Sequence, residues 1–364
     1  MRKEHLTFLS DPVTQESFSL IVLEESGDHV QSGILKNSTT WYPIISGIPR
    51  IMIEELRENL LQTRHQFLND FRDQLPEVAR NEWQASVDRI KDFDNFITHQ
   101  KKTAESFAYE WKYIYKENSY ERENFFHFAG PYITPDNIQG KITVDIGCGS
   151  GRFTKWAALS GTQISFGTDL GESVEVAYQL TKDIKNVCIV QADIYAMPFR
   201  GVFDLAYSIG VLHHLPQPEQ GFQKLPSVLK KNGEMVIWVY NRRNNARALY
   251  FYEPLRDLIK NFSKPVLFKI SYIPALAVHI INMLTHILNW YGFKKLAKKV
   301  PFSYYAHFPF NMKLNDTFDV LATPKSNYYY VEEIEQWFKN AKLENVTAFE
   351  HPEAGITCTG RYVS

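Results

Sequence analysis

A glycine-rich turn between an apolar run and a helical pattern constrains the fold of this chain more than any other feature. Residues 144–151 read VDIGCGSG, and the amphipathic sequence GRFTKWAALSG continues from the last glycine. Glycine adopts positive φ without strain and lets the backbone approach a ligand that a Cβ would exclude. A dinucleotide-binding fingerprint needs Gly or Ala at position 152, and Arg152 disfavours that interpretation.

Short apolar runs repeat along the second half of the chain. The segments KITVDIG, TQISFGTDL, NVCIVQAD, FDLAYSIG and GEMVIWVY alternate with amphipathic stretches between residues 141 and 240. Strands that alternate with helices predict a parallel α/β sheet covered by helices on both faces. A further helix and two more strands are expected between residues 328 and 364.

Acidic residues stand at three successive predicted strand ends. Asp169 follows Asp145 by 24 residues, and Asp193 follows Asp169 by another 24. A carboxylate after the second strand can accept hydrogen bonds from both hydroxyls of a ribose. Asp193 could accept from the amine of an adenine while the amide of Ile194 donates to the ring. Helix capping explains one such aspartate equally well, but the set of three favours a nucleoside site.

These motifs together resemble the class I S-adenosylmethionine (SAM) dependent methyltransferases. The resemblance covers residues 139–241 and 328–364. It implies an α/β fold with a Rossmann-like, seven-stranded sheet, a methyltransferase activity, and SAM as the cofactor. The cofactor-binding residues it implies are Asp145, Gly147, Cys148, Gly149, Gly151, Asp169, Leu170, Asp193, Ile194 and Ser208.

Methyl transfer is an in-line displacement that depends on alignment and needs no covalent residue. A base is required only when the acceptor is a neutral hydroxyl or a protonated amine. His213 and His214 follow the fourth predicted strand and Tyr240 ends the fifth, so we expect these candidate catalytic residues near the acceptor. A structural hydrogen-bonding role for the histidines and plain packing for Tyr240 are the alternatives.

The first 55 residues resemble the zinc-ribbon-like module found before some RNA methyltransferases and in small methyltransferase activators. The positions where that module carries cysteines hold Asp11, Thr14, Asn37 and Thr40. These side chains provide no thiolates, so no metal is expected. Residues 56–138 form a predicted helical extension. Its segment TAESFAYEWKYIYKE, at 103–117, is expected either to cover the cofactor or to pack in the core.

An insertion at residues 242–326 interrupts the predicted methyltransferase domain, which spans 139–364. Its stretch 270–293 carries no charge over 24 residues, although polar side chains recur along one helical face. The first interpretation is a buried cap helix within a lid. Residues expected to reach the acceptor are Tyr240, Arg242, Glu253 and Arg256. An interfacial membrane helix flanked by Lys294, Lys295, Lys298 and Lys299 is the alternative, and a spanning helix is the third choice.

Composition limits where such a protein acts. Hydrophobic residues make up 44% and charged residues 22% of the 364 residues, which excludes a disordered or collagen-like chain. The net charge of -1 gives no global positive field for nucleic acid. Three scattered cysteines support neither disulfides nor zinc, and the first residues lack the apolar run of a signal peptide.

We therefore expect a cytoplasmic SAM-dependent methyltransferase acting on a small or lipid-like metabolite, with nucleic acid not expected as a partner. Association with the inner face of the membrane through residues 270–299 is the finer alternative for its location. The alternative functions are a tRNA or rRNA methyltransferase and a non-catalytic SAM-binding scaffold.

Overall fold

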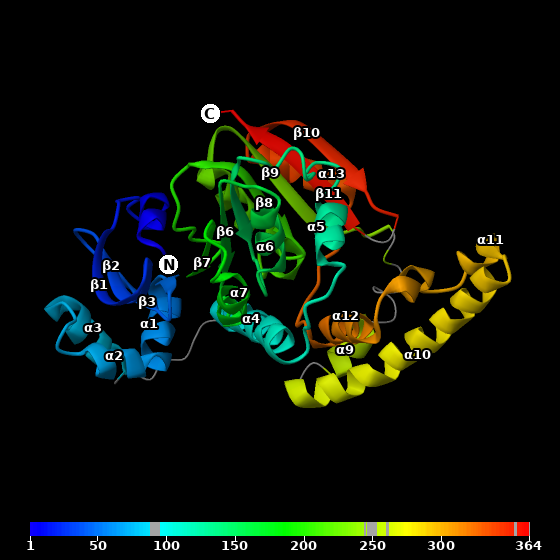
Figure 1. The fold of residues 1–364 in the computed structure, drawn as a ribbon, viewed down its shortest axis with the longest axis horizontal. Helices are drawn as coiled ribbons and strands as arrows, with labels where there is room; N and C mark the ends of the chain where they lie inside the picture. Colours follow the sequence, from blue (N-terminus) through cyan, green and yellow to red (C-terminus); the bar gives the residue numbers. More distant parts are fainter. Residues whose placement is uncertain (88–94, 244, 246–252, 260–261, 353–354, 364) are drawn as a thin grey trace.

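A mixed sheet runs through the whole molecule (Figure 1). The computed structural model describes residues 1–87, 95–243, 245, 253–259, 262–352 and 355–363. Eleven strands are ordered β1-β2-β3-β4-β7-β6-β5-β8-β9-β11-β10. The strands of the second half are β5 (Ile142–Ile146), β6 (Ile164–Asp169), β7 (Val187–Ala192), β8 (Phe203–Ile209), β9 (Leu229–Tyr240), β10 (Leu343–Glu350) and β11 (Gly355–Tyr362).

The predicted seven-stranded α/β sheet is confirmed in this second half. Strand β5 pairs in parallel with β6 and β8, whereas β11 is antiparallel to its neighbours β9 and β10. All six residues of β7 are buried, as expected for a parallel strand covered on both faces. Three helices cover one face, α5 (Glu121–Ala129), α6 (Arg152–Leu159) and α7 (Ser173–Thr181). The other face carries α8 (Pro218–Lys224) and α13 (Val331–Asn340).

The N-terminal module extends this sheet instead of forming a separate one. Its strands are β1 (Ser19–Ser26), β2 (His29–Lys36), β3 (Trp41–Ile45) and β4 (Ile48–Ile51), paired antiparallel in sequence order. Strand β4 then pairs in parallel with β7, with Arg50 opposite Gln191 and Ile51 opposite Ala192. The module therefore covers what would otherwise be the free edge of β7.

Side-chain hydrogen bonds hold two turns of the N-terminal module. The Asp11 carboxylate accepts from the backbone N–H groups of Val13 and Thr14, at 2.9 and 2.7 Å. The Asn37 side-chain oxygen accepts from the N–H groups of Thr39 and Thr40, at 3.0 and 2.8 Å. Such Asx turns close a loop locally. They give these turns a fixed shape by contacts that need no metal.

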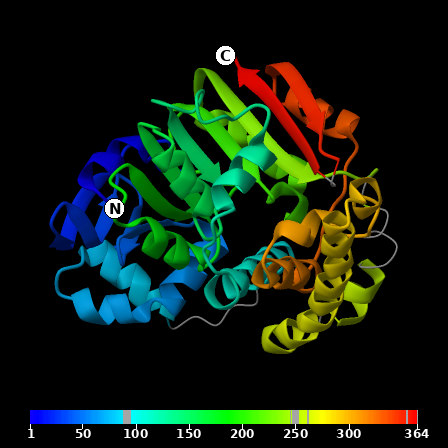
Figure 2. The ribbon, with the colours of Figure 1, turned by 45° about the vertical axis from the view of Figure 1, so that its right-hand side comes forward.

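The helical extension leads from the module across the strand ends. It contains α1 (Glu54–Thr63), α2 (His65–Phe71), α3 (Glu77–Val87) and α4 (Asn95–Tyr113), and ends with α5. Figure 2 shows α4 running beneath the carboxyl ends of the parallel strands, beside the insertion. This position is where open α/β sheets bind their ligands.

The insertion is helical but is not buried as the sequence led us to expect. It contains α9 (Glu253–Ile259), α10 (Lys264–Trp290), α11 (Lys294–Ala297), a 3-10 turn at Ser303–His307, and α12 (Phe310–Ala322). Helix α10 projects away from the sheet (Figure 1), and only 22% of its most apolar stretch is buried. By length and composition, α10 is the one helix among the described residues that is long and apolar enough to cross a membrane. The predicted buried cap helix is wrong for α10, because α12 and the 3-10 turn take the position beside the sheet.

Candidate functional site

A cavity of about 780 Å³ opens at the carboxyl ends of β5 to β9. Its walls come from the glycine turn, the loops after the strands, helix α4 and the second half of the insertion. The predicted site residues that line it are Gly147, Cys148, Gly149, Asp169, Leu170, Asp193, Ile194, His214 and Tyr240. The structure thus brings together residues spread over nearly a hundred positions of the sequence.

The glycine turn has the backbone geometry that only glycine adopts freely. Gly147, Gly149 and Gly151 have φ values of 81°, 53° and 78°. A Cβ on Gly149 would lie 2.8 Å from the indole nitrogen of Trp111, so this α4 side chain sits directly on the turn. The guanidinium of Arg152 lies 5.0 Å from the centre of the same indole ring. Trp111 of α4 therefore covers the glycine turn, whereas Tyr109 of the same segment packs against Phe318, and a contact with the cofactor stays a prediction.

Asp169 is held in place by backbone donors on both sides. Its two carboxylate oxygens accept from the N–H of Gly149 at 3.0 Å and the N–H of Gly171 at 2.9 Å. Burial raises the pKa of this carboxyl group, and the backbone hydrogen bonds oppose that rise. Each carboxylate oxygen retains a lone pair for another donor. The arrangement fits the two hydroxyls of a ribose.

Asp193 has a partner that the sequence did not reveal. One oxygen of its carboxylate accepts from the Gln100 side-chain amide at 3.1 Å and from the N–H of Tyr195 at 3.1 Å. The other end of the Gln100 amide, its oxygen, is buried and has no hydrogen-bond partner among the described residues. Gln100 lines the cavity, so this oxygen is an acceptor that an amine of a ligand can satisfy.

Three predicted cofactor residues support the turn from behind and do not line the cavity. Asp145 is fully buried and accepts from the Thr154 hydroxyl at 2.7 Å. Burial raises the pKa of Asp145 to about 7. Ser208 donates to the carbonyl of Ile146 at 2.8 Å, and Gly151 begins helix α6. These residues fix the shape of the turn.

The two adjacent histidines lie in different environments. The His213 ring is fully buried, and neither of its nitrogens has a partner among the described residues. Burial lowers its pKa well below the usual value, so the ring is neutral at physiological pH. His214 lines the cavity, with one ring nitrogen 3.1 Å from the carbonyl of Lys325. Of the two histidines, His214 lines the cavity and His213 does not, and a catalytic role for either stays a prediction.

Aromatic side chains form a chamber beyond the glycine turn. The rings of Tyr240 and Tyr328 are stacked, with centroids 5.5 Å apart and planes 19° apart. Tyr304 and Tyr305 line the same cavity from the insertion. Buried Arg256 is also a lining residue and donates to the Ser326 hydroxyl at 3.1 Å.

Arg242, which was also predicted to reach the acceptor, does not line this cavity. The exposed Arg242 places its guanidinium 5.6 Å from the centre of the Tyr330 ring. The side chain of Glu253 lies outside the part of the chain that the structure describes.

An acidic group on the wall of the chamber was missed in the sequence. Glu110, from α4, accepts from the side-chain amide of Asn315 at 2.7 Å. Asn315 belongs to α12, which also contributes Asp316 and Asp319 to the wall. Burial raises the pKa of Asp316 to about 6, and a hydrogen bond from Tyr305 opposes that rise. The spacing of 315, 316 and 319 places these side chains on one helical face, a signal that the sequence did contain.

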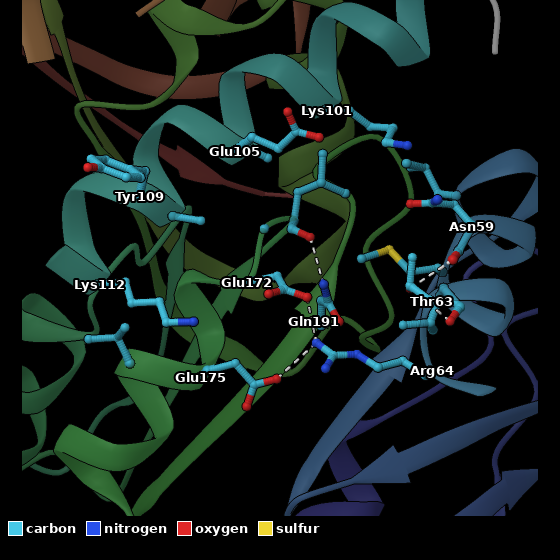
Figure 3. A pocket seen from close by; sticks show the side chains of 18 of the residues that line it. Asn59, Thr63, Arg64, Lys101, Glu105, Tyr109, Lys112, Glu172, Glu175 and Gln191 are labelled. Carbon is cyan, nitrogen blue, oxygen red and sulfur yellow. Dashed lines mark hydrogen bonds and ion pairs between the residues drawn. The ribbon is translucent and has the colours of Figure 1, made fainter. Parts of the chain in front are cut away.

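A second pocket of about 710 Å³ borders the turn that carries Asp169 (Figure 3). Arg64 lies between Glu172 and Glu175, at 2.8 and 3.1 Å, and Figure 3 shows these groups converging. Gln191 donates to the carbonyl of Leu170 at 2.9 Å. The pocket separates the N-terminal helices from α7. Its ion pairs fasten the helical extension to the segment that follows Asp169.

Part of the chain matches a known family. Residues 144–237 match the methyltransferase domain family. A tRNA U34 carboxymethyltransferase of Ruthia magnifica is 28% identical over 116 residues, which are 31% of this chain and 36% of the relative. A tRNA U34 carboxymethyltransferase of Vibrio cholerae is 31% identical over 112 residues, 29% of this chain and 34% of the relative. The chain thus spans about a third of the length of these relatives.

Solved structures of methyltransferases are also similar. A SAM-dependent methyltransferase from Mesorhizobium loti is 30% identical, covers 30% of this chain and 51% of its own, and superposes with a TM-score of 0.28. The magnesium protoporphyrin IX methyltransferase of Synechocystis PCC 6803 with bound S-adenosylhomocysteine is 11% identical, with a TM-score of 0.43. It covers 74% of this chain and 100% of its own.

The family match over residues 144–237 and the curated relatives confirm the predicted methyltransferase domain and, with it, the predicted enzyme class and SAM as the cofactor of that class. The prediction of a small or lipid-like acceptor is wrong, because the curated relatives are named for tRNA. The prediction that nucleic acid is not a partner is wrong for the same reason. It rested on a net charge of -1, and a sum over the whole chain does not describe the local field at one cavity.

Proposed function

We propose that this chain is a SAM-dependent methyltransferase that acts on RNA, with tRNA as the acceptor class. The observation that carries the proposal is the continuity of one cavity from the glycine turn into the aromatic chamber of Tyr240 and Tyr328. Enzymes that modify a base take it out of the helical stack and hold it between aromatic or apolar side chains. The chamber has the side chains for that task.

The residues of the glycine turn fit SAM. The Asp169 carboxylate is positioned for the ribose, and Asp193 with the unsatisfied oxygen of Gln100 suits the adenine amine. The glycine turn lets the backbone approach the methionine part of the ligand, and Trp111 covers it. SAM supplies an activated methyl group on a sulfonium. The protein aligns that group with the acceptor and keeps water away.

On the acceptor side, the chamber contains groups able to accept a proton. Asp316 lines the cavity, and burial raises its pKa to about 6, so it is mostly a carboxylate at pH 7. We propose Asp316 as the base for an acceptor hydroxyl, with the Tyr305 hydroxyl holding the carboxylate. His214 is the second candidate on the wall. The aromatic chamber beyond the glycine turn leaves space for an acceptor, which favours a catalytic enzyme over a scaffold that only binds SAM.

Transfer of labelled methyl from SAM to purified RNA tests the proposal. We expect label in tRNA isolated from cells that lack this gene and little in tRNA from wild-type cells, whose sites are already modified. Ribosomal RNA and a small-molecule extract from the mutant cells are parallel acceptors. Label in the extract and in neither RNA would overturn the RNA proposal. Asp169→Ala is the control for cofactor-independent background.

An acceptor of this class agrees with the predicted cytoplasmic location. The finer prediction, a position at the inner face of the membrane, depends on helix α10.

A further inference from the structure

Helix α10 turns its most apolar face toward solvent. Seven large apolar residues at helical spacing are between 50% and 87% exposed, namely Ile273, Leu276, Ile280, Met283, Leu284, Ile287 and Trp290. Residues spaced by three and four lie on one side of a helix. We call these seven residues the apolar stripe. Contiguous exposed apolar surface is rare on monomeric soluble proteins and marks an interaction site.

The opposite face of α10 is the more polar one, and it is the face that contacts the protein. Ser271, Asn282 and Thr285 are buried there. The Asn282 amide donates to the carbonyl of Phe302 at 2.7 Å, and the His286 ring nitrogen lies 2.9 Å from the carbonyl of Ala306. The polar stripe in the sequence is therefore explained by contacts with the rest of the insertion. These contacts also hold the helix along the body of the protein.

Charge along this segment has one sign. Between Leu258 and Asn315 the sequence contains no Asp or Glu, and it contains eight lysines. Four of them, Lys294, Lys295, Lys298 and Lys299, follow the apolar stripe directly and are exposed. Trp290 ends the stripe and is 87% exposed, and Tyr291 and Phe293, between it and these lysines, are 70% and 60% exposed. Aromatic residues followed by lysines are typical of the boundary between lipid chains and headgroups.

We propose that α10 and α11 dock the protein on the surface of an anionic membrane. The apolar stripe enters the boundary of the acyl chains, and the four lysines contact the acidic headgroups. The helix lies in the plane of the membrane and does not span it, because Asn282 and His286 keep its other face on the protein. The inference concerns where the enzyme works and does not depend on the identity of its acceptor.

Other occupants fit the segment less well. A second copy of the chain would bring another acid-free, lysine-rich segment against this one, with no carboxylate in it to pair with the lysines. RNA would satisfy the lysines but would leave the seven apolar side chains in water. An anionic bilayer satisfies both features at once.

Flotation of the full-length protein with vesicles tests the proposal. We expect binding to vesicles of equal parts phosphatidylglycerol and phosphatidylcholine, weakened by salt, and little binding to pure phosphatidylcholine. The variant Ile280→Glu/Ile287→Glu should lose the binding. Replacing the four lysines by Gln should weaken it by at least about a hundredfold, since each lysine near an anionic surface contributes about 1 kcal/mol.

Matched variants separate docking from general effects. Val78→Glu/Leu159→Glu places the same charges at exposed apolar positions elsewhere, and Lys339→Gln/Lys342→Gln removes exposed lysines outside the insertion. Both should bind vesicles like the wild type. All variants should keep the wild-type melting temperature, because the altered side chains are exposed.

Three results would overturn the proposal. One is equal recovery of the wild type and Ile280→Glu/Ile287→Glu with anionic vesicles. Another is a stable dimer in light scattering that this variant dissociates, which would assign the stripe to a second copy. The third is lysine-dependent binding of tRNA together with no binding to anionic vesicles.

Discussion

The Gln100 side chain, which lines the cavity, donates to Asp193 and leaves its own oxygen buried without a hydrogen-bond partner among the described residues. The two residues come from α4 and from the loop after β7, 93 positions apart in the sequence. Together they present acceptors where an adenine amine is expected. A water-exposed pair would not be selective, whereas a buried unsatisfied acceptor favours a ligand that donates to it.

Replacing Gln100 by Leu should weaken the binding of S-adenosylhomocysteine by about 0.5–1.5 kcal/mol, the usual contribution of one hydrogen bond. Calorimetry gives the affinity. The inosine analogue of the ligand lacks the amine, so it should bind the wild type more weakly and should not be weakened further by the substitution. Gln139→Leu, at an exposed position, is the control. Equal loss for both ligands would assign Gln100 a purely structural role.

Asp169→Ala should reduce SAM affinity more strongly, because it removes charge-assisted hydrogen bonds worth about 1.5–3 kcal/mol each. Titration calorimetry at constant pH measures the change. Asp70→Ala alters an exposed aspartate and should have no effect. A melting temperature close to that of the wild type would show that the loss is not caused by unfolding. Unchanged affinity would remove Asp169 from the ribose position.

Tyr328→Ala should raise KM for RNA with little change in SAM affinity, because the stacked pair with Tyr240 is opened. Stacking on an aromatic side chain contributes about 1–3 kcal/mol per base, which corresponds to roughly 5- to 150-fold. Tyr328→Phe keeps the ring, so its KM for RNA should stay close to that of the wild type. Steady-state methylation at saturating SAM separates KM from kcat. A fall in kcat alone would contradict a stacking role.

Activity should rise with pH and reach half of its maximum near pH 6, because Asp316 acts as the base only when deprotonated and burial raises its pKa to about 6. Asp316→Asn should abolish that limb of the profile. Tyr305→Phe removes a hydrogen bond that lowers this pKa and should move the limb to higher pH. Asp319→Asn removes a neighbouring negative charge that raises it and should move the limb to lower pH. If the pH of half-maximal activity is the same in the wild type and all three variants, Asp316 is not the base.

Asp11→Ala should lower the free energy of unfolding by about 1–3 kcal/mol, because it leaves the buried Tyr42 hydroxyl and two partly buried N–H groups of the first turn without an acceptor. The lost contacts include the bond from the Tyr42 hydroxyl, at 2.9 Å. Denaturant titration measures the change. Thr14→Ala keeps the backbone donors and should cost less. A zinc chelator should leave the melting temperature of the wild type unchanged, and a large drop would contradict a turn held by side-chain hydrogen bonds.

Features encoded within one strand and its following loop could be predicted from the sequence. The glycine turn and Asp169 are of this kind, because alternation and turn chemistry are local. Gln100 and Asp316 could not be placed, since they reach the cavity only through the packing of α4 and α12, far away in the chain. Periodicity in α10 revealed a polar stripe, but periodicity does not say which face meets the protein. Parallel pairing of β4 with β7 rests on two residue pairs and leaves no mark in either strand.

That pairing decides what a minimal catalytic fragment can be. A fragment cut to residues 139–364 would leave the edge of β7 open next to Asp193, with unpaired N–H and C=O groups and no β4 to cover them. Open edges invite strands of other molecules, so such a fragment is expected to aggregate. Truncation studies should therefore begin at Met1, and loss of activity in a shorter fragment should be checked against loss of solubility before it is credited to substrate recognition.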